Sequence, residues 1–255
     1  MTSGDQDKIM CFNMKYPEKS LILAARDIRY LLEQGYPKSS AIRFVGDHYG
    51  LEKSRRYILS RNVLAPDVAS ARNRKRVPCT CIRDRHILID GYNVLITLES
   101  YLKGEEIWIG DDGFIRDNRG IFRSHVNDKD TFRSAGLMLS LLRANAAGEI
   151  TVILDRQMSM SGQLAMAIRQ QMAETGVRGQ VITSGSTDHD LKKARSCDIV
   201  ASADGVIIDA VVEVIDIPAC IISGDQHSWK SLYSLGSVQP DQQEIQKAKE
   251  DNTDK

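Results

Sequence analysis

The sequence of 255 residues lacks several features, and each absence excludes a class of protein. No apolar run approaches the roughly 20 residues of a membrane-spanning helix. The first residues, MTSGDQDKIM, include acids and lack the basic start and apolar core of a secretory signal. Only 6 residues are proline and 42% are hydrophobic, which is typical of a folded globular chain. We therefore expect a soluble, cytoplasmic protein without a membrane partner.

The cysteines are few and odd in number, five in all, which excludes a set of disulfides that uses every one of them. Cys79 and Cys81 form a C-x-C pair, which would be half of a zinc site. Structural zinc commonly has four ligands, however, and the sequence has no second pair. It also lacks a G-x-G-x-x-G motif after the first predicted strand, so dinucleotide binding is disfavoured. We expect neither zinc nor a dinucleotide.

The sequence has no net charge, with 34 basic and 34 acidic residues, but the two signs are unevenly distributed. Residues 1–86 contain 17 Lys and Arg against 9 Asp and Glu, a charge of +8, and the remainder therefore carries −8. Such a split indicates a polyanion, such as nucleic acid, as a partner of the basic half. Attraction between two oppositely charged domains is the alternative.

Residues 1–77 are predicted to form a small, basic, all-helical domain. One amphipathic helix follows Ser20, a second covers AIRFVGDHYG, and a third begins near Leu51 or Glu52. The last two, joined by a glycine turn, resemble a helix-turn-helix, whose charges would contact phosphates. A three-helix bundle with a solvated basic face is the alternative. The basic residues of the third helix are Lys53, Arg55, Arg56 and Arg61.

The boundary between two domains is predicted near residue 80. ASARNRKRVP, residues 69–78, is expected to be a polar, basic connection, with residues 78–85 as the linker into a second domain that covers residues 86–238. Residues 239–255 are predicted to be a polar tail, either disordered or loosely helical.

The second domain is predicted to be an α/β sandwich. Short apolar runs occur at residues 86–90, 151–155, 180–184, 198–202 and 219–223. Helical patterns lie between them, including TFRSAGLMLSLLRANAA, SGQLAMAIRQQMAETG and VIIDAVVEVI. Apolar strands that alternate with helices favour a parallel sheet with helices on both faces.

Residues 104–127 depart from this alternation. Asp-Gly and Asn-Arg-Gly turn signals between alternating apolar residues predict a β-hairpin, inserted between the first strand and its helix. We expect it to lie over a site as a lid or to cover a sheet edge. If it folds over a site, Arg116 and Arg123 would hold a phosphate; as the alternative, both are turn and surface residues.

An acid follows every predicted strand. These acids are Asp90, Asp155, Asp188 with Asp190, Asp204 and Asp225. The carboxyl ends of parallel strands open onto one edge of a sheet, where ligands bind, so we expect the acids to converge. A single Asp at such a place is more often a helix cap, but an acid after each strand is harder to attribute to capping.

Converging carboxylates favour a bound cation. Two charges about 5 Å apart repel by about 3 kcal/mol at an effective dielectric constant near 20. Oxygen ligands with access to water suit Mg²⁺ or Mn²⁺, and these ions activate water and stabilise a phosphoryl transition state. The sequence therefore predicts a Mg²⁺ or Mn²⁺ site that includes Asp90.

The stretch LIDGYNVLI resembles the first strand of the NYN branch of PIN-like nucleases, whose motif is an apolar strand followed by Asp-Gly-x-Asn. VILD, ITSGSTDHD and DIVASADG are similar to its later segments, so the resemblance covers roughly residues 86–225. It implies a sheet with the first strand between the second and the fourth and the fifth at an edge, so that Asp225 is remote. It also implies that Asn93 orients the phosphate or a water. The implied metal ligands are Asp90, Asp155, Asp190 and Asp204, with Asp188 as the alternative to Asp190.

The resemblance implies a metal-dependent ribonuclease, with DNA as a further candidate substrate, that leaves a 3′-hydroxyl and a 5′-phosphate. A helical domain joined to such a domain also resembles a two-part archaeal and bacterial protein family of unassigned function. A phosphatase of the haloacid dehalogenase type is disfavoured, since its second Asp is replaced by Tyr92. The alternative that stays open is an inactive nucleic-acid-binding or assembly protein of the same fold. A homo-oligomer also stays open.

Overall fold

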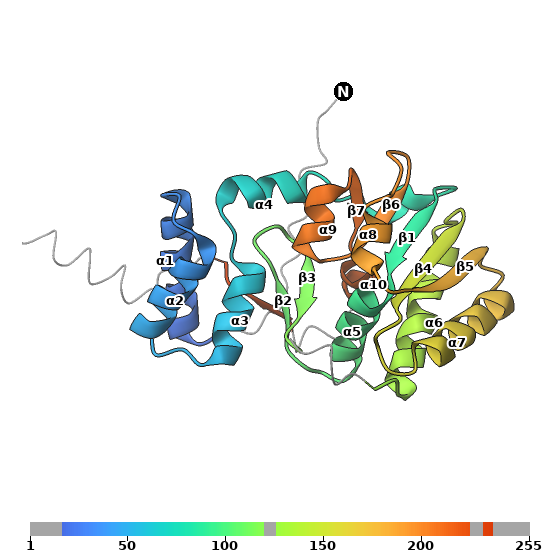
Figure 1. Cartoon of the computed structure of the whole chain (residues 1–255), viewed down its shortest axis with the longest axis horizontal. Helices are drawn as coiled ribbons and strands as arrows, with labels where there is room; N and C mark the ends of the chain where they lie inside the picture. Colours follow the sequence, from blue (N-terminus) through green and yellow to red (C-terminus); the bar gives the residue numbers. More distant parts are fainter. Residues whose placement is uncertain (1–16, 120–125, 225–231, 237–255) are drawn as a thin grey trace, which may run out of the picture.

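The computed structural model describes residues 17–119, 126–224 and 232–236. Figure 1 shows a helical part, a small sheet and a larger α/β part side by side. Helices α1 (Lys19–Glu33), α2 (Lys38–His48) and α3 (Lys53–Asn62) pack together around buried leucine, isoleucine and alanine side chains. The three predicted helices are therefore present. No helix in the described ranges is long and apolar enough to span a membrane.

The predicted basic connection, residues 69–78, belongs in fact to a helix and to the edge of the sheet. Helix α4 (Pro66–Asn73) includes its first half, with Pro66 at a position where the missing N–H costs little. Further on, the N–H of Val77 donates to the carbonyl of Val214 at 2.9 Å, and the N–H of Val214 donates to Lys75 at 2.8 Å. The expectation of a free connection is wrong, because this segment pairs with an edge strand.

Five parallel strands form the main sheet, in the order β5-β4-β1-β6-β7. They are β1 (Ile87–Asp90), β4 (Ile150–Asp155), β5 (Gly179–Ser184), β6 (Ile199–Ala201) and β7 (Glu213–Ile215). The first strand lies between the second and the fourth, as expected, and β7 lies at an edge. All five carboxyl ends therefore open on the same edge.

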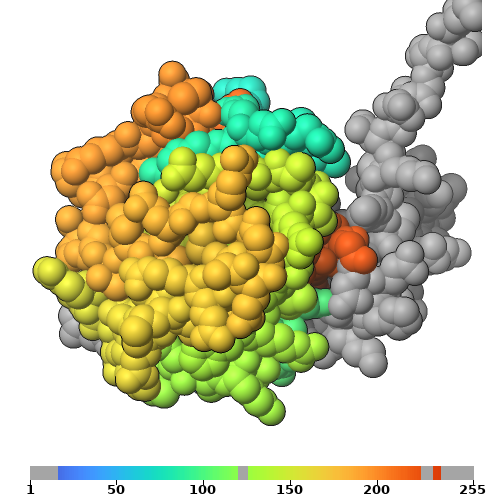
Figure 2. All heavy atoms as spheres, turned by 90° about the vertical axis from the view of Figure 1, so that its right-hand side faces the viewer, coloured from blue at the N-terminus to red at the C-terminus, as the bar shows by residue number. Residues whose placement is uncertain are grey.

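Both faces of the sheet are covered, because side chains alternate along each strand. Ile87 and Ile89 of β1 face one cluster of apolar side chains, and Leu88 faces another. The first cluster lies under α5 (Gly91–Leu102), α6 (Lys129–Ala144), α7 (Ser161–Thr175) and α10 (Ile217–Gly224). The second lies under α8 (Thr187–Leu191) and α9 (Gly205–Ala210). Figure 2 shows the end of the α/β part where the green-to-gold side chains of α6 and α7 lie together.

The fifth strand is not where the sequence predicts it. Residues 219–223, predicted as a strand, lie in α10, and the strand is β7, inside the predicted helix 206–215. Asp216 accepts the N–H of Ala219 at 2.9 Å and Pro218 is the second helical residue, so this segment begins as a helix. An apolar run of this length does not by itself distinguish a strand from a buried helix.

Helix α5 is missing from the sequence prediction. It begins at Gly91, directly after β1, and almost all of its residues are buried. The predicted hairpin therefore follows α5 instead of interrupting the connection between the first strand and its helix. A helix that is buried on almost all sides has no exposed polar face opposite an apolar stripe, which explains the omission.

The hairpin forms a small sheet between the helical part and the α/β part. Strands β2 (Ile107–Ile109) and β3 (Ile115–Asp117) are antiparallel, and β8 (Leu232–Ser234) adds to β2 in parallel. On one side Trp108 stacks on Tyr233, with ring centroids 4.8 Å apart, and packs into the helical core. On the other side Ile107 and Ile115 pack with residues of α5 and α10. The hairpin joins the two parts, a role that neither the lid nor the sheet-edge prediction describes.

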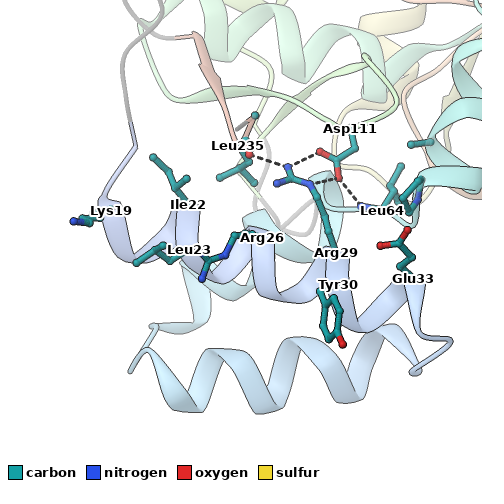
Figure 3. Close-up of a pocket in the computed structure, with 13 residues that line it drawn as sticks. Lys19, Ile22, Leu23, Arg26, Arg29, Tyr30, Glu33, Leu64, Asp111 and Leu235 are labelled. Atoms are coloured by element: carbon teal, nitrogen blue, oxygen red, sulfur yellow. Dashed lines mark hydrogen bonds and ion pairs between the residues drawn. The ribbon is translucent and has the colours of Figure 1, made fainter. Parts of the chain in front are cut away.

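An ion pair also ties α1 to the hairpin turn (Figure 3). Nη2 and Nε of Arg29 donate to the two carboxylate oxygens of Asp111 at 2.7 and 2.9 Å, and Nη2 also donates to the carbonyl of Leu235 at 2.8 Å. Asp111 in turn accepts the N–H of Leu64 at 3.0 Å. A bidentate arginine contact of this kind fixes orientation as well as distance.

A disulfide joins Cys79, in the short 3-10 helix Cys79–Ile82, to Cys220 of α10, across 141 residues of sequence. Cys81 is exposed and free, as is Cys197. The two halves of the C-x-C pair therefore have different roles, and Cys79 is unavailable to a metal.

Reducing this disulfide is expected to lower the free energy of unfolding by about 2–4 kcal/mol, because the unfolded chain regains the freedom that a long closed loop restricts. Urea unfolding with and without dithiothreitol measures the difference, and Cys79→Ser should show the reduced value under both conditions. An unchanged midpoint after confirmed reduction would contradict this expectation.

Candidate functional site

Asp90 is the last residue of β1, half-buried at the carboxyl edge of the sheet. The chain enters α5 at the very next residue, Gly91, and passes close to strand β4 as it does so. A Cβ at residue 91 would lie 2.5 Å from Cδ2 of Leu154 and 3.0 Å from the carbonyl oxygen of Ile153. The glycine of D-G-Y-N therefore allows the helix to begin immediately behind the acid.

Ser202 connects Asp90 to the neighbouring strand end. Its hydroxyl donates to Oδ2 of Asp90 at 2.9 Å and accepts the N–H of Asp204 at 3.1 Å. Ser202 follows β6, which pairs with β1, so the sheet itself brings these groups together. Asp204 caps α9 by accepting the N–H of Val206 at 2.7 Å. A serine hydroxyl thus bridges the two strand ends that carry Asp90 and Asp204.

The loop that carries Asp204 is held from three sides. The carboxamide oxygen of Asn93 accepts the N–H of Ala203 at 2.8 Å, and Nε of Arg116 donates to the carbonyl of Ala203 at 2.9 Å. The guanidinium of Arg72 lies against Gly205, where a Cβ would be 2.6 Å from two of its nitrogens. Asn93 therefore positions the loop through its oxygen, and the predicted contact of Asn93 with phosphate or water stays a prediction.

The electrostatic state of Asp90 reflects this setting. Burial raises the pKa of Asp90 to about 7, and the negative charges of Asp204 and Asp188 act in the same direction, against the hydrogen bond from Ser202. A cation placed among these carboxylates would offset the repulsion and favour the ionised form. The raised pKa of Asp90 is therefore consistent with a site for a cation.

Asp188 and Asp190 lie at opposite sides of the short helix α8. Asp190 accepts the hydroxyl of Ser184 at 2.5 Å, and this hydrogen bond lowers its pKa. Asp188 is exposed, and its charge contributes to the raised pKa of Asp90. The structure thus favours Asp188 over Asp190, the preferred residue of the sequence analysis, as the acid of α8 that acts on Asp90.

Asp155 ends β4, on the other side of β1. Its carboxylate accepts the N–H of Gln157 at 2.8 Å. Burial raises the pKa of Tyr92 to about 12, and the charge of Asp155 adds to this effect. Asp155 therefore faces the first turn of α5, near Asp90 in the fold but without a hydrogen bond to it among the described contacts.

The described residues contain no group of three or more acids, histidines or cysteines placed closely enough to hold a metal ion as they stand. Mg²⁺, however, usually keeps several waters and uses only one or two protein carboxylates. Asp90 and Asp204, joined through Ser202, supply hard oxygen donors of this kind. The donor chemistry fits Mg²⁺ or Mn²⁺, and Asp188 would complete the set at the rim.

Two of the basic residues predicted to contact nucleic acid are engaged in ion pairs. Arg55 of α3 pairs with Glu106 beside the hairpin at 3.0 Å, and Arg56 pairs with Asp47 at 2.7 Å. Lys53 is exposed at the start of α3. Helix α3 also packs against β2, so it is not a free recognition helix. Some of the basic residues of the first half pair with acids of the second half, namely Arg29 with Asp111, Arg55 with Glu106 and Arg72 with Asp209.

Arg61 points in a different direction. Nη1 of Arg61 donates to the hydroxyl of Tyr57 at 3.0 Å. Burial opposes the positive charge of Arg61, but the charges of Asp117, Tyr57 and Asp204 favour it, and the pKa of Arg61 is raised as a result. Of the four basic residues predicted on α3, this one lies toward the acidic site.

Arg116, predicted to hold a phosphate, is instead buried, with 2% of its surface exposed. Its two terminal nitrogens donate to both oxygens of Asp112 at 2.8 and 2.7 Å, and Asp112 is fully buried. Both terminal nitrogens are thus engaged by Asp112, which disfavours the predicted contact with a phosphate, and the burial of Arg116 contradicts the alternative that it is a turn and surface residue. Arg123 and Asp225 lie outside the described residues.

Sequence reasoning missed two groups at this site. Ser202 is assigned no role by the sequence analysis, although its place two residues before Asp204 is a visible signal for the bridge to Asp90. Arg72 was assigned to the connection, yet it pairs with Asp209 of α9 at 2.7 and 2.8 Å. No local sequence pattern marks a contact across 137 residues.

Comparisons with known proteins identify the family. No solved structure matches the chain. An uncharacterized protein of Methanocaldococcus jannaschii is 32% identical over 202 residues, which is 78% of this chain and 95% of that protein. Residues 20–75 match a protein family of unknown function, DUF434, and residues 79–220 match a domain of unknown function, DUF5616. Since the second match covers more than half of the chain, the protein belongs to the DUF5616 family.

Proposed function

We propose that the protein is a metal-dependent nuclease, with RNA as its main substrate, and that its α/β part is a PIN-like domain of the NYN type. The observation that carries the proposal is the Ser202 hydroxyl, which joins Asp90 at the end of the central strand to the loop of Asp204 at the end of its neighbour. The strand order and the D-G-Y-N and S-A-D segments support the same reading.

The proposed reaction is hydrolysis of a phosphodiester bond. A water adds its oxygen to phosphorus, the bond from phosphorus to the 3′ oxygen breaks, and the water's proton ends on that oxygen, which leaves a 5′-phosphate and a 3′-hydroxyl. A divalent cation, when bound, supplies charge stabilisation and a more acidic water. Asp90 and Asp204 would hold the cation, Ser202 fixes their mutual position, and Asn93 and Arg116 keep the loop of Asp204 in place.

A nucleic-acid-binding or assembly protein without catalysis is the second candidate. It is favoured by one observation, the lack of a ready group of three metal-binding side chains among the described residues. Such a protein would retain the fold and its acidic rim but bind divalent cations weakly.

The direct test is incubation of the purified chain with single-stranded and structured RNAs and a single-stranded DNA, in Mn²⁺ and in EDTA. The proposal expects cleavage only with Mn²⁺, faster on RNA than on DNA, with 5′-phosphate ends on the products. Cleavage that persists in EDTA, or products with 2′,3′-cyclic phosphates, would contradict it, because neither requires a metal-activated water.

The two acids of α8 should respond differently to substitution. Asp188→Asn is expected to reduce cleavage about 10- to 100-fold, the range seen when groups around a metal are removed, because Asp188 acts on Asp90. Asp190→Asn, which removes the same charge two residues away, should have a smaller effect, since Asp190 is engaged by Ser184. Initial rates of the two variants on one RNA decide this, and the reverse order would restore the sequence-based preference for Asp190.

A further inference from the structure

A cavity adjoins the acidic site, on the side of the helical part. It has a volume of about 480 Å³, within the usual range of ligand pockets, roughly 300–1,000 Å³. Asp204 and Gly205 line it from the α/β part, and Leu64 and Val68 line it from the helical part. Its four cationic side chains are Lys38, Arg61, Arg72 and Arg116. We call it the basic pocket.

Two of these four cations are available to a ligand. Arg72 is paired with Asp209, and Arg116 with Asp112. Lys38, at the start of α2, and Arg61 form no ion pair with any carboxylate of the described residues. Lys38 is moreover half-buried in the pocket wall. Charges held away from water without a partner are costly, so this arrangement suits an anion.

The charge state of Lys38 supports the same conclusion. Burial, together with the positive charges of Arg72 and Arg116, lowers the pKa of Lys38 to about 8, against smaller opposing effects of Asp112 and Asp111. A bound anion would reverse these effects and favour the charged ammonium.

The larger groove along α1 offers no comparable set of half-buried cations without an ion-pair partner (Figure 3). Its volume is about 990 Å³, but its Arg29 is occupied by Asp111 and Leu235, and its Arg26 pairs with Asp27. Its third cation, Lys19, is exposed to solvent and not held in a wall of the groove. The basic pocket therefore stands apart as a site for an anion.

We propose that the basic pocket binds a phosphate group of the nucleic-acid strand, with Lys38 and Arg61 as its ligands, beside the cleavage site at Asp204. This proposal rests on the proposed function for the identity of the ligand. Its geometry explains why a helical domain accompanies the α/β domain: residues of α2, α3 and α4 complete a pocket that the sheet edge alone does not form. The phosphate is either an internal phosphodiester or a terminal group.

Binding is tested without divalent metal, so that cleavage has no part in the result. In the full-length chain with ¹³C-methylated lysines, inorganic phosphate should raise the pKa of Lys38, assigned through Lys38→Ala, and should not change the titration of Lys129. Lys129, exposed at the start of α6, is a matched control of equal charge. Equal responses of both lysines, or none, would overturn the proposal.

The strand itself is tested by fluorescence anisotropy in EDTA with a 5′-phosphorylated and a 5′-hydroxyl RNA oligonucleotide. Lys38→Ala should weaken binding about tenfold, the effect of one charge-assisted hydrogen bond, and Lys129→Ala much less. If Lys38→Ala weakens the binding of both RNAs, the bound group is an internal phosphodiester. If it weakens the binding of the phosphorylated RNA alone, the bound group is a terminal phosphate. If Lys38→Ala binds RNA as tightly as the wild type, the proposed phosphate site is refuted, even if the protein is an active nuclease. If Lys38→Ala weakens binding but the protein cleaves no RNA, only the proposed nuclease activity is refuted.

Lys38→Ala is expected to fold, because it removes a charge that two arginines repel. Lys38→Met, which keeps most of the side-chain volume, should behave in the same way in both experiments. A difference between the two variants in RNA binding would mean that packing and not charge is being measured, and it would count against the proposal.

Discussion

Replacing Asp90 by Asn is expected to reduce metal-dependent cleavage on the order of 10³-fold. A metal ion stabilises a phosphoryl transition state by several kcal/mol, and each 1.36 kcal/mol corresponds to a factor of ten in rate. Asn preserves the shape of the side chain and can still accept the hydroxyl of Ser202, so the fold at the strand end should be retained. The rate is measured at saturating Mn²⁺, beside the wild-type chain.

The same variant should be more stable than the wild type above neutral pH without metal. The pKa of Asp90 is about 7 in the folded chain and near 4 when unfolded, so the folded state binds the proton more tightly. Stability of the wild type from this group is therefore lost as pH rises from about 4 through 7. Asn does not ionise, and Asp90→Asn should exceed the wild type by about 2–4 kcal/mol at pH 8 but not at pH 4.

Urea unfolding at the two pH values checks this difference, with Glu149→Gln as a control. Glu149 is exposed and directly precedes β4, so it lies at the amino edge of the sheet, opposite the carboxyl edge. A variant that is less stable than the wild type at pH 8 would show that the fold depends on the Asp90 carboxylate, and the cation site would lose its main electrostatic support.

Replacing Arg116 by Ala should lower the free energy of unfolding by about 3–5 kcal/mol, the effect of breaking a buried ion pair on one side only. Asp112 is fully buried and would lose its bidentate partner. Arg72, at 3.5 Å, is its remaining cation. The carbonyl of Ala203 would also lose its donor, so the loop of Asp204 should loosen as well.

Denaturant unfolding of Arg116→Ala is compared with Arg26→Ala, which breaks an exposed pair and should change stability by less than about 1 kcal/mol. The double variant Arg116→Met with Asp112→Leu should recover part of the loss, because apolar side chains leave no buried charge. A loss below 1 kcal/mol in Arg116→Ala would mean that this pair does not support the fold.

The sequence predicts the sheet well where its signal is local. The runs that end in Asp90 and Asp155 are apolar, short and followed by turn residues, and both are strands with the expected parallel order. The run at 219–223 is equally apolar but follows Pro218 and the cap at Asp216, so it is helical. The distinction depended on two residues before the run rather than on its own composition.

The placement of Asp90 and Asp204 at neighbouring strand ends was predictable from the sequence, whereas the contacts that support them were not. Asp90 and Asp204 are recognisable because each follows an apolar strand. The roles of Arg72 and Arg116 depend on contacts across 137 and 87 residues of sequence, which no local pattern encodes. The basic charges of the first domain were equally ambiguous, since a partner within the chain and a polyanion outside it attract the same side chains.

The central claim, a divalent cation held at the carboxyl edge of the sheet, is tested most directly by Mn²⁺ binding, measured by electron paramagnetic resonance at pH 7.5 on the wild type and Asp90→Asn. The account predicts that the wild type binds Mn²⁺ and that the variant binds it at least about tenfold more weakly, the lower end of the effect of altering a metal site. Equal binding by both proteins, or no binding by the wild type, would contradict it.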